Sequence, residues 1–567
     1  MKKLEKIYSA DKFDTIREYI NKAVEKYGEK EAFIIKNKEQ KNVKYTKITY
    51  NQFKKDIEEL GTGLIDMGLQ GKRIAIIGNN SYEWAQTYIS ILCGVGIIVP
   101  LDKGLQEEEI KLSLKRSKVD AVIFEEKYSE VMKQIKEGAN NTIKYFINMK
   151  KKTDDYSIEE IKEKGKKLLN NNDTRFKDYS INPDDMATII FTSGTTSMSK
   201  AVMLSNRNIA TNIYDMQCTE NITSKDINML FLPLHHTFGS TGLILFLANG
   251  ATNVFCDGLR HIQENLKEYR VTTFVCVPLL LEAMYKNMLK EIDKQGKTNL
   301  IKFALKVSNL LMKFKIDIRR KLFKPIINQL GGDIRFIISG ASAINKKVAK
   351  GFNDFGILTV QGYGLTETSP VLCAENEKHI KYGSVGLPMP HVEIKIANKN
   401  EDGIGEIIAK APNVMLGYYE MQEETEKVIK DGWFNTGDIG YLDKDGYLFI
   451  SGREKNVIVL KNGKNVYPEE IEQLIGKLPY VSEVMVFGKE KEDDLIVSAK
   501  VVYNKEYIKE KYENIEEKEL KEIIWKDIKK INHSMPKYKY VKNLIITDEP
   551  MVKTTTAKIK RFEELKK

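Results

Sequence analysis

Short apolar runs rich in β-branched residues alternate with longer amphipathic segments along the first two thirds of this 567-residue chain. Amphipathic helices are expected at 52–67 and 104–116, for example. Strands that alternate with helices build βαβ units and lie parallel in one sheet. The expected strands are 73–78, 121–124, 187–194, 253–256, 272–278, 335–340 and 357–362. We therefore predict an α/β fold whose ligands bind beyond the carboxyl ends of the strands.

The pattern changes after about residue 380, where turn signals such as GSVGLP, EDGIG and DKDG crowd between short strands. This spacing is typical of antiparallel β structure. The segment 452–465 marks a boundary, so we predict two domains, residues 1–452 and 453–567. The second is expected to contain a helix at 468–477, strands at 484–488 and 495–503, a charged helical stretch at 507–531 and a last strand at 543–547.

Composition excludes several classes of protein. With 42% hydrophobic residues the chain can bury a core, so global disorder is excluded. A net charge of +11 is mild for this length, and no nucleic-acid motif accompanies it. The five cysteines form no CxxC pair, which argues against a disulfide framework. Because the charged N-terminus is unlike a signal peptide and no apolar run reaches about 20 residues, we expect a cytoplasmic protein.

The segment TIIFTSGTTSMSKAVMLSNRNI (188–209) has features of a phosphate site. A strand is expected to end at Thr192, and a small hydroxyl-rich turn follows it. Such a turn exposes backbone N–H groups, and Lys200 adds positive charge, so the two can hold phosphates. The Walker motif is excluded because it needs Gly where the chain has Ser199. The alternative is an ordinary polar loop between a strand and a helix.

Two further segments have features of a nucleotide site. In VQGYGLTETSPV (360–371), two glycines allow a backbone to approach a flat ring, and Thr366 and Glu367 can hold a divalent cation. In 431–472, Asp438 can accept hydrogen bonds from ribose hydroxyls, and Arg453 can donate to the same sugar or to a phosphate. Taken singly, each segment is equally compatible with a surface turn. A basic segment, KTTTAKIKR (553–561), lies near the end of the chain.

These four segments occur together, in this order and at this spacing. In this respect the sequence resembles the adenylate-forming family of acyl-CoA synthetases, peptide-synthetase adenylation domains and firefly luciferase. The resemblance extends to three more segments. Residues 48–102 are similar to the opening segment of the family. FLPLHHTFGS (231–240) is similar to its carboxylate-pocket segment, and RFIISGASAI (335–344) is similar to its adenine strand. KNGKNVYPEEIE and GSVGLPMP look most like bacterial long-chain fatty acid–CoA ligases.

The resemblance implies a fold and a reaction. The fold would be a large N-terminal domain of mixed sheets flanked by helices, with a β-barrel-like part, and a small mobile α+β C-terminal domain with its hinge at Lys455. A long- or medium-chain fatty acid and ATP would give acyl-AMP and pyrophosphate, and the CoA thiol would then displace AMP. ATP, fatty acid and CoA are thus the expected partners, and Mg²⁺ the expected cofactor.

The resemblance also implies roles for single residues. The phosphates of ATP would be held by Thr192, Ser193, Gly194, Thr195, Thr196 and Lys200, with Mg²⁺ near Glu367. The adenine slot would be lined by Gly340, Ala341, Ser342, Gly362, Tyr363 and Gly364, and Thr366 would reach the α-phosphate. Asp438 and Arg453 would hold the ribose, and Lys558 would bridge the carboxylate and the α-phosphate. His236 and Gly239 would lie at the acyl entrance, and Gly463 and Lys464 at the face that receives CoA.

The chain departs from the family pattern at five positions. Ser197, Ser199 and Ala201 replace Gly, Pro and Gly in the phosphate loop, Asn206 replaces His, and Ala557 replaces a tail Gly. Two alternatives therefore stay open. One is a fatty acyl-ACP or acyl-AMP ligase with a carrier protein as acceptor, and the other is a weakly active adenylate-binding paralogue. Nothing in the sequence supports a luciferase-like oxygenase.

The stretch 302–326 combines an apolar helical face with a high content of Lys and Arg. The face consists of Phe303, Val307, Leu310, Leu311, Phe314, Ile318 and Leu322. A basic amphipathic helix can lie on an anionic bilayer, so one interpretation is peripheral contact at the inner face of the membrane. The other is an ordinary helix that packs this face on the core and leaves its basic face in water.

Overall fold

A computed structural model describes residues 2–39, 42–139, 141–150, 156–192, 199–461, 464–491, 494–512, 515–554 and 558–566. The chain forms two compact units. Over the described residues, the first contains 2–192, 199–393 and 410–432, and the second contains 394–409 and 433–566. Within the described part, no helix is both long and apolar enough to cross a lipid bilayer.

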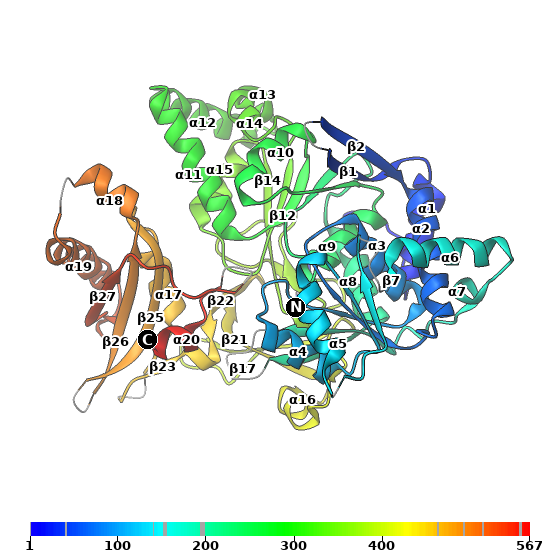
Figure 1. The fold of residues 1–567 in the computed structure, drawn as a ribbon. Coiled ribbons are helices and arrows are strands. Elements are labelled where there is room, and N and C mark those ends of the chain that lie inside the picture. Colours follow the sequence, from blue (N-terminus) through cyan, green and yellow to red (C-terminus); the bar gives the residue numbers. More distant parts are fainter. Residues whose placement is uncertain are drawn as a thin grey trace. The chain divides into compact units, whose positions relative to one another are not determined.

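One sheet of the first unit has eight strands in the order β19-β9-β8-β4-β3-β5-β6-β7 (Figure 1). The strands are β3 (Arg73–Ile77), β4 (Ile97–Pro100), β5 (Ala121–Phe124), β6 (Tyr145–Asn148), β7 (Tyr156–Ser157), β8 (Met186–Thr192), β9 (Lys200–Ser205) and β19 (Gly417–Tyr418). From β8 to β7 the neighbours are parallel. β3 and β5 are buried almost throughout, as expected for parallel strands covered on both faces.

The second sheet of this unit has nine strands in the order β16-β15-β14-β13-β12-β10-β11-β1-β2. The strands are β1 (Glu31–Glu39), β2 (Asn42–Thr49), β10 (Ile227–Leu230), β11 (Thr252–Phe255), β12 (Thr273–Cys276), β13 (Phe336–Ser339), β14 (Leu358–Gly364), β15 (Val371–Ala374) and β16 (Leu387–Pro388). The run from β14 to β1 is parallel, and β2, β15 and β16 add antiparallel edges. Both sheets are therefore mixed, as expected.

Helices of the first unit connect and cover these sheets (Figure 1). They are α1 (Ile16–Tyr27), α2 (Tyr50–Asp66), α3 (Tyr82–Ser90), α4 (Glu107–Ser117), α5 (Ser129–Glu137), α6 (Ile158–Asn170), α7 (Arg175–Asp178), α8 (Asn206–Thr219), α9 (Thr237–Ala248), α10 (Ile262–Glu268), α11 (Pro278–Lys294), α12 (Thr298–Lys313), α13 (Arg319–Leu322), α14 (Lys324–Gln329), α15 (Lys346–Asp354) and α16 (Gln422–Val428). α9 is apolar around most of its circumference, and most of its residues are buried.

The second unit contains antiparallel strands and a small α/β layer. β18 (Gly405–Lys410) and β22 (Leu448–Arg453) pair antiparallel with β21 (Trp433–Leu442), and β17 (Glu393–Ala397) lies beside β18. A separate sheet has the order β25-β26-β27. The remaining elements are β23 (Ile458–Val459), β24 (Asn465–Val466), β25 (Val481–Lys491), β26 (Asp494–Tyr503), β27 (Asn543–Thr547), α17 (Pro468–Ile475), α18 (Lys505–Lys511), α19 (Glu517–His533) and α20 (Arg561–Lys566).

The predicted α/β fold with mixed sheets and a smaller C-terminal part is confirmed. The boundary at residue 453 and the hinge at Lys455 stay predictions. Two helical expectations are wrong in length. The charged stretch 507–531 forms two helices, because Tyr512 has an extended backbone conformation and ends α18.

The stretch 302–326 is also divided. α12 ends at Lys313, and Lys315 lies in the left-handed region with φ +62°. The Asp317 side chain then accepts a hydrogen bond from the Arg319 N–H (3.0 Å), which starts the short α13. A side chain that bonds to the backbone in this way competes with helix continuation.

Two glycines allow α2 and α6 to touch along their backbones. A Cβ built on Gly165 of α6 would lie 1.8 Å from the carbonyl oxygen of Glu59 in α2. A Cβ on Gly63 of α2 would lie 2.3 Å from the carbonyl oxygen of Ile161 in α6. The two helices are neighbours in Figure 1. Because each glycine faces backbone of the other helix, a side chain at either position forces the helices apart.

We expect Gly165→Ala to destabilise the first unit by about 1–3 kcal/mol, the cost typical of overpacking. The matched control is Gly242→Ala in α9, where the added Cβ meets only Val275 at an ordinary 3.5 Å. That control should be neutral or more stable by about 0.5–1 kcal/mol, because Ala restricts the unfolded chain. Urea unfolding followed by circular dichroism measures both. Equal midpoints for the two variants would contradict the close approach of α2 and α6.

Candidate active site

The predicted phosphate segment lies in a hairpin of two strands. Thr192 ends β8 and Lys200 begins β9, and the two residues pair in the antiparallel register. The Thr192 hydroxyl donates to the Lys200 carbonyl oxygen (3.3 Å). A strand therefore follows the loop, and the alternative of a strand-to-helix loop is wrong; α8 begins only at Asn206. Ser193, Gly194, Thr195 and Thr196 lie outside the described residues.

Three of the unusual residues in this region have structural explanations. Ala201 is buried within β9, where a strand backbone accepts Ala as readily as Gly. The Ser199 hydroxyl accepts a hydrogen bond from Arg116 (3.4 Å), and the Ser199 carbonyl oxygen accepts from the same nitrogen (2.7 Å). The buried Asn206 side chain accepts one from the Ile16 N–H (3.1 Å) at the start of α1. Ser197 and Ala557 lie outside the described residues.

The Lys200 ammonium lies between an aromatic ring and a carboxylate. Its Nζ is 4.4 Å from the centre of the Tyr418 ring and 2.9 Å from Glu424 Oε2. A lysine above a tyrosine face is stabilised by the ring quadrupole. Lys427 and Lys200 lower the pKa of Glu424 to about 2, so this carboxylate is ionised at neutral pH. The ammonium is thus placed at the base of the loop, with an internal counter-ion.

Glu367 is joined to the same arrangement through Tyr418. The Tyr418 hydroxyl donates to Glu367 Oε1 (3.0 Å), so one tyrosine contacts both the lysine and the predicted metal ligand. The Glu367 carbonyl oxygen accepts from the Met415 N–H (2.8 Å), and Asn413 donates to the Thr368 carbonyl oxygen (2.5 Å). The turn that carries Thr366 and Glu367 is therefore held by the segment 413–418.

The donors at this place fit Mg²⁺. Glu367 is half-buried, and its second carboxylate oxygen, Oε2, accepts no hydrogen bond from the residues that the structure describes. Mg²⁺ prefers oxygen ligands and is commonly bound by one or two carboxylates together with substrate phosphates. The Glu367 carboxylate, which Tyr418 joins to Lys200, meets that description.

The predicted adenine residues meet at one edge of the nine-stranded sheet. β13 and β14 are parallel neighbours, and Ser339 pairs with Gln361. Gly340 therefore follows β13, and Gly362 and Tyr363 lie among the last residues of the adjacent strand β14. Ala341 has φ +71°, and Ser342 is exposed. A non-glycine residue in the left-handed region is unusual and occurs preferentially at functional sites.

The two glycines of β14 have different surroundings. A Cβ on Gly364 would lie 1.7 Å from the Pro370 carbonyl oxygen, so the chain itself requires glycine there. Packing against the Pro370 backbone is therefore sufficient by itself to explain the glycine at position 364. A Cβ on Gly362 would meet nothing closer than 3.6 Å. The adenine role of these residues stays a prediction.

The predicted acyl segment borders this edge. His236 is half-buried and immediately precedes α9. A Cβ on Gly239 would lie 2.3 Å from the Pro233 carbonyl oxygen, so this glycine lets α9 start against the preceding loop. A Cβ on Gly340 would lie 2.7 Å from the Phe238 ring. Phe238 thus connects the acyl segment with the adenine edge, although the sequence did not single it out.

In the second unit, Asp438 and Arg453 bind each other. They are paired across β21 and β22, and Arg453 Nε lies 2.7 Å from Asp438 Oδ1. Asp438 is buried, whereas the Arg453 side chain is 46% exposed. Gly437 precedes this pair with φ +67°. A buried carboxylate beside an exposed guanidinium offers an acceptor and a donor in one place.

The other predicted residues of the second unit lie on its surface. Lys455 lies in a short turn, Glu454–Asn456, and is exposed. Lys464 is exposed, and its Nζ lies 4.7 Å from the centre of the Tyr538 ring. Lys558 is exposed in the tail, where its N–H donates to the Thr554 hydroxyl (3.1 Å) and its carbonyl oxygen accepts from the Thr554 N–H (2.8 Å). Gly463 lies outside the described residues.

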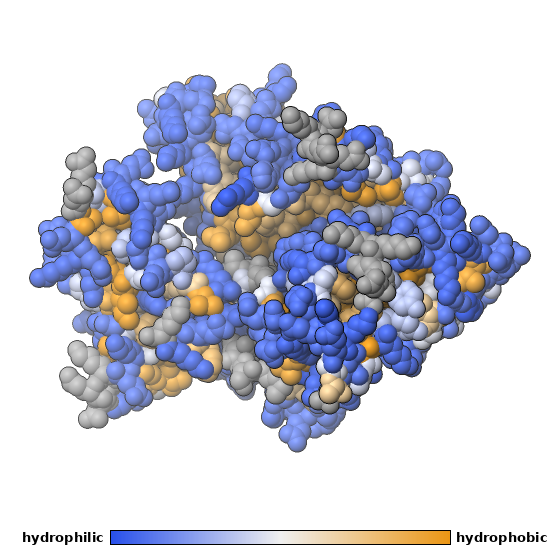
Figure 2. Space-filling model, viewed as in Figure 1, coloured by the Kyte–Doolittle hydropathy of each residue, from blue (hydrophilic) through white to orange (hydrophobic). Residues whose placement is uncertain are grey.

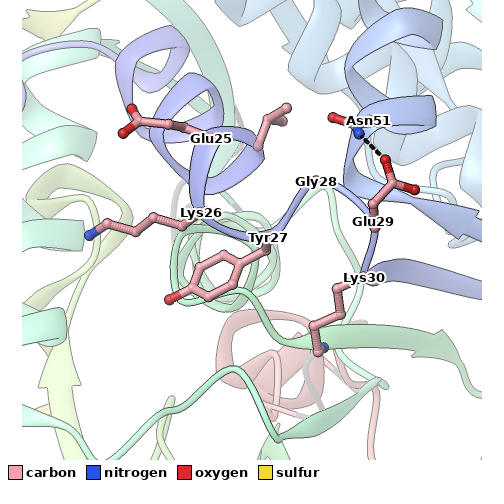
Figure 3. Close-up of a pocket in the computed structure, with 8 residues that line it drawn as sticks. Glu25, Lys26, Tyr27, Gly28, Glu29, Lys30 and Asn51 are labelled. Atoms are coloured by element: carbon pink, nitrogen blue, oxygen red, sulfur yellow. Dashed lines mark hydrogen bonds between the residues drawn. The ribbon is translucent and has the colours of Figure 1, made fainter.

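A separate shallow pocket contains none of the predicted residues. It is lined by Val24, Glu25, Lys26, Tyr27, Gly28, Glu29, Lys30 and Asn51. Figure 3 shows these side chains around the turn after α1, where Asn51 donates to Glu29 (2.7 Å). The Lys30 ammonium is bound by the Gly250 carbonyl oxygen and the Thr252 hydroxyl. The pocket is therefore not the candidate active site.

Tyr418 and Glu424 are the other residues that the sequence did not single out. Both lie more than two hundred residues after Lys200 in the chain. Glu424, which binds Lys200, is 224 residues away. β19 pairs with β9, and Tyr418 lies opposite Val202. Spacing along the chain contains no signal for such a pairing.

Comparison with known proteins tests the resemblance to a known family that the sequence predicts. The family described as AMP-binding enzyme matches residues 20–419, and that described as AMP-binding enzyme C-terminal domain matches residues 455–567. Fatty acyl-CoA synthetase B of Dictyostelium discoideum is 27% identical over 84% of this chain and 75% of its own. Long-chain-fatty-acid--CoA ligase 5 of Mus musculus is 29% identical over 92% and 83%.

The chloroplastic long-chain-fatty-acid--[acyl-carrier-protein] ligase AEE15 of Arabidopsis thaliana is 26% identical over 95% of this chain and 83% of its own. Among solved structures, an anthranilate CoA ligase in complex with anthranoyl-AMP has a TM-score of 0.76 at 18% identity, covering 97% of this chain and 96% of that chain. A Mycobacterium tuberculosis fatty acyl CoA synthetase has a TM-score of 0.64 at 22% identity, with 97% of both chains covered. The fold and the family models agree with the predicted resemblance, and this chain belongs to the family of AMP-binding enzymes.

Proposed function

We propose that this enzyme is an acid–thiol ligase that activates a long- or medium-chain fatty acid as acyl-AMP and then forms a thioester with CoA. Family membership supports the adenylate-forming reaction, and relatives named long-chain fatty acid ligases support the substrate class. The relative named for an acyl-carrier-protein acceptor keeps a carrier protein as the alternative to CoA. The observation on which the proposal depends most is the joining of Lys200 and Glu367 by Tyr418.

The chemistry explains why charge neutralisation is needed. A carboxylate oxygen of the acid attacks the α-phosphorus of ATP, and the bond to pyrophosphate breaks. The thiol of CoA then attacks the acyl carbonyl, and AMP leaves. In the first step several negative charges approach one another, so positioning and electrostatic stabilisation dominate catalysis.

Each group of residues has a part in this scheme. Lys200 and the loop after Thr192 hold the β- and γ-phosphates. Mg²⁺ bound at Glu367 would neutralise part of their charge. The edge formed by Gly340 and Gly362 receives the adenine. The Asp438–Arg453 pair holds the ribose, and Lys558 contacts the carboxylate and the α-phosphate during adenylation.

The acyl chain is expected beside His236 and Phe238. In Figure 2 a hydrophobic hollow opens in the first unit where Figure 1 labels β12 and β14. An apolar hollow beside the adenine edge suits a substrate with an acyl chain and a carboxylate at one end.

A carboxylate panel tests the proposal. Acids of two to eighteen carbons and aromatic acids are assayed for pyrophosphate release, with and without CoA. We expect release to be greatest for medium or long chains and to turn over only with CoA. A burst without turnover would indicate a carrier protein as acceptor, and the holo form of such a protein would then restore turnover. Absence of release with every acid would contradict the proposed activity and favour a weakly active paralogue.

Lys558→Ala should slow adenylation by about 10²–10³, because a group that stabilises only transition-state charge contributes about that factor. The variant should still convert supplied acyl-AMP and CoA to the thioester. The control is Lys560→Ala, whose side chain forms an exposed ion pair with Glu563. Rapid-quench assays of the two half-reactions measure both. Equal loss in the two half-reactions would contradict the assignment of Lys558 to adenylation.

Glu424→Gln should lower the KM for ATP about two- to fivefold, the range expected for release of one exposed ion pair. The phosphates then no longer compete with this carboxylate for Lys200. The matched control is Glu423→Gln, one residue away in α16. The folded-state pKa of Glu424 is depressed, so the ion pair is present above the ordinary value of 4.5 and is lost only as pH falls toward 2. The difference in KM between Glu424→Gln and the wild type should therefore persist throughout the neutral pH range. Equal KM values would show that Glu424 does not compete with the phosphates of ATP for Lys200.

We also propose that α12 contacts an anionic membrane surface. Leu300, Phe303, Val307, Leu310 and Phe314 are 37–69% exposed and recur at helical spacing. The opposite side of α12 packs on the core through Ile301, Ala304 and Leu305. Exposed lysines flank the exposed stripe, namely Lys302, Lys306, Lys313, Lys315, Lys321 and Lys324. Apolar side chains that can enter a bilayer and cations that attract anionic headgroups therefore occur on one surface.

Sedimentation with liposomes tests this contact. We expect the protein to sediment with vesicles of anionic phospholipid and much less with neutral ones. Phe303→Asp combined with Phe314→Asp should abolish sedimentation, whereas Leu112→Asp, at a similarly exposed position on α4, should not. Equal and negligible binding to both lipids would contradict the proposal. Concentration-dependent dimerisation lost in the double variant would assign the stripe to a second copy of the chain instead.

A further inference from the structure

Three metal-binding side chains lie together outside the residues discussed so far for nucleotide binding. Asp102 lies in the loop after β4, and His235 and His236 lie between β10 and α9. One ligand atom of each residue, an imidazole nitrogen or a carboxylate oxygen, lies within 4.8 Å of the other two. Both mixed sheets of the first unit contribute to this cluster, because β4 belongs to one and β10 to the other.

His235 is the buried member of the cluster. It is 4% exposed, and its Nε2 lies 3.2 Å from Asp102 Oδ1. Although the two atoms are close, Nε2 has no hydrogen bond of acceptable geometry within the described structure. A buried polar atom without a hydrogen bond is costly unless another ligand satisfies it. The His235 and His236 rings lie 4.5 Å apart between their centres.

The backbone around these side chains is fixed by hydrogen bonds. Asn80 accepts from the Leu234 N–H (3.0 Å) and donates to the Leu232 carbonyl oxygen (2.8 Å). Asp102 Oδ1 accepts from the Gly104 N–H (2.8 Å), which orients the carboxylate. The nearby cation Lys103 directs its ammonium to Asn79 Oδ1 (3.1 Å). Ligands oriented by surrounding hydrogen bonds are typical of metal sites.

We propose that Asp102, His235 and His236 bind one transition-metal ion, with Zn²⁺ the expected occupant. Imidazole nitrogens and a carboxylate oxygen bind Zn²⁺ at about 2.0–2.2 Å, with three protein ligands leaving a fourth position for water. Two imidazoles make this site softer than a lone carboxylate such as Glu367, so we expect it to prefer Zn²⁺ over Mg²⁺.

Zn²⁺ and Co²⁺ titrations of the full-length protein, stripped of metal with a chelator, test the site. Wild-type protein should take up one equivalent of Zn²⁺ in competition with a chromophoric chelator. Bound Co²⁺ should give the strong visible absorption of four- or five-coordinate geometry. Asp102→Asn and His236→Gln should each weaken Zn²⁺ binding at least about tenfold, which is the lower end of the loss in affinity caused by disturbing a metal site. His261→Gln is the control, because His261 is exposed on another loop and pairs with Glu264.

The site is supported if the wild type binds Zn²⁺, if Asp102→Asn and His236→Gln both weaken that binding, and if His261→Gln leaves it unchanged. Unchanged binding in Asp102→Asn and His236→Gln, or no uptake by the wild type, would overturn it. If a variant fails to fold, as judged by circular dichroism, the Co²⁺ spectrum of the wild type decides. Weak octahedral absorption alone would then reject the inference. Because the readout is metal binding, it holds or fails independently of the proposed ligase activity.

Discussion

The pairing of β19 with β9 is the contact on which the candidate site depends. It is only two residues long, yet it brings 417–424 against the strand that begins with Lys200. Gly417 makes the pairing possible, because its φ of +141° is open to glycine and a Cβ would lie 2.8 Å from Thr425. Tyr418 then contacts Lys200 through its ring and Glu367 through its hydroxyl. One tyrosine thus sets the separation of the cation and the carboxylate.

Opposite charges at this place need such a spacer. If Lys200 and Glu367 paired directly, each would neutralise the other. The positive charge of Lys200 would then attract a polyphosphate less, and the negative charge of Glu367 would attract a cation less. The ring of Tyr418 lies beside the ammonium, and its hydroxyl occupies a single carboxylate oxygen. Lys200 is instead balanced by Glu424, an ionised carboxylate on the exposed helix α16. Both side chains of this ion pair are partly exposed, so an anionic substrate could compete with Glu424 for Lys200.

Much of the fold and part of the site could be predicted from the sequence. Continuous β-branched runs such as 73–77 and 121–124 form buried parallel strands because both faces of the sheet are covered. The strand ends near Thr192 and Gly340 are confirmed, whereas β14 continues two residues beyond its predicted end at Gly362. The helix predicted over 302–326 failed because Lys315 adopts a left-handed conformation and Asp317 starts a new turn. The apolar stripe on α12 was visible in the sequence, but its exposure was not.

The sequence by itself therefore determined the strand and helix pattern, the family, and the residue types available for phosphate, ribose and metal. Only the tertiary structure decided which of them meet. Tyr418 and Glu424 reach Lys200 through a strand pairing between distant segments, and Asp102 reaches His235 because the ends of two sheets adjoin. Gly364 proved to be a packing residue because a carbonyl oxygen occupies the space beside it. Local preference acts over a few neighbouring residues, whereas these contacts arise from burial and pairing between segments far apart in the chain.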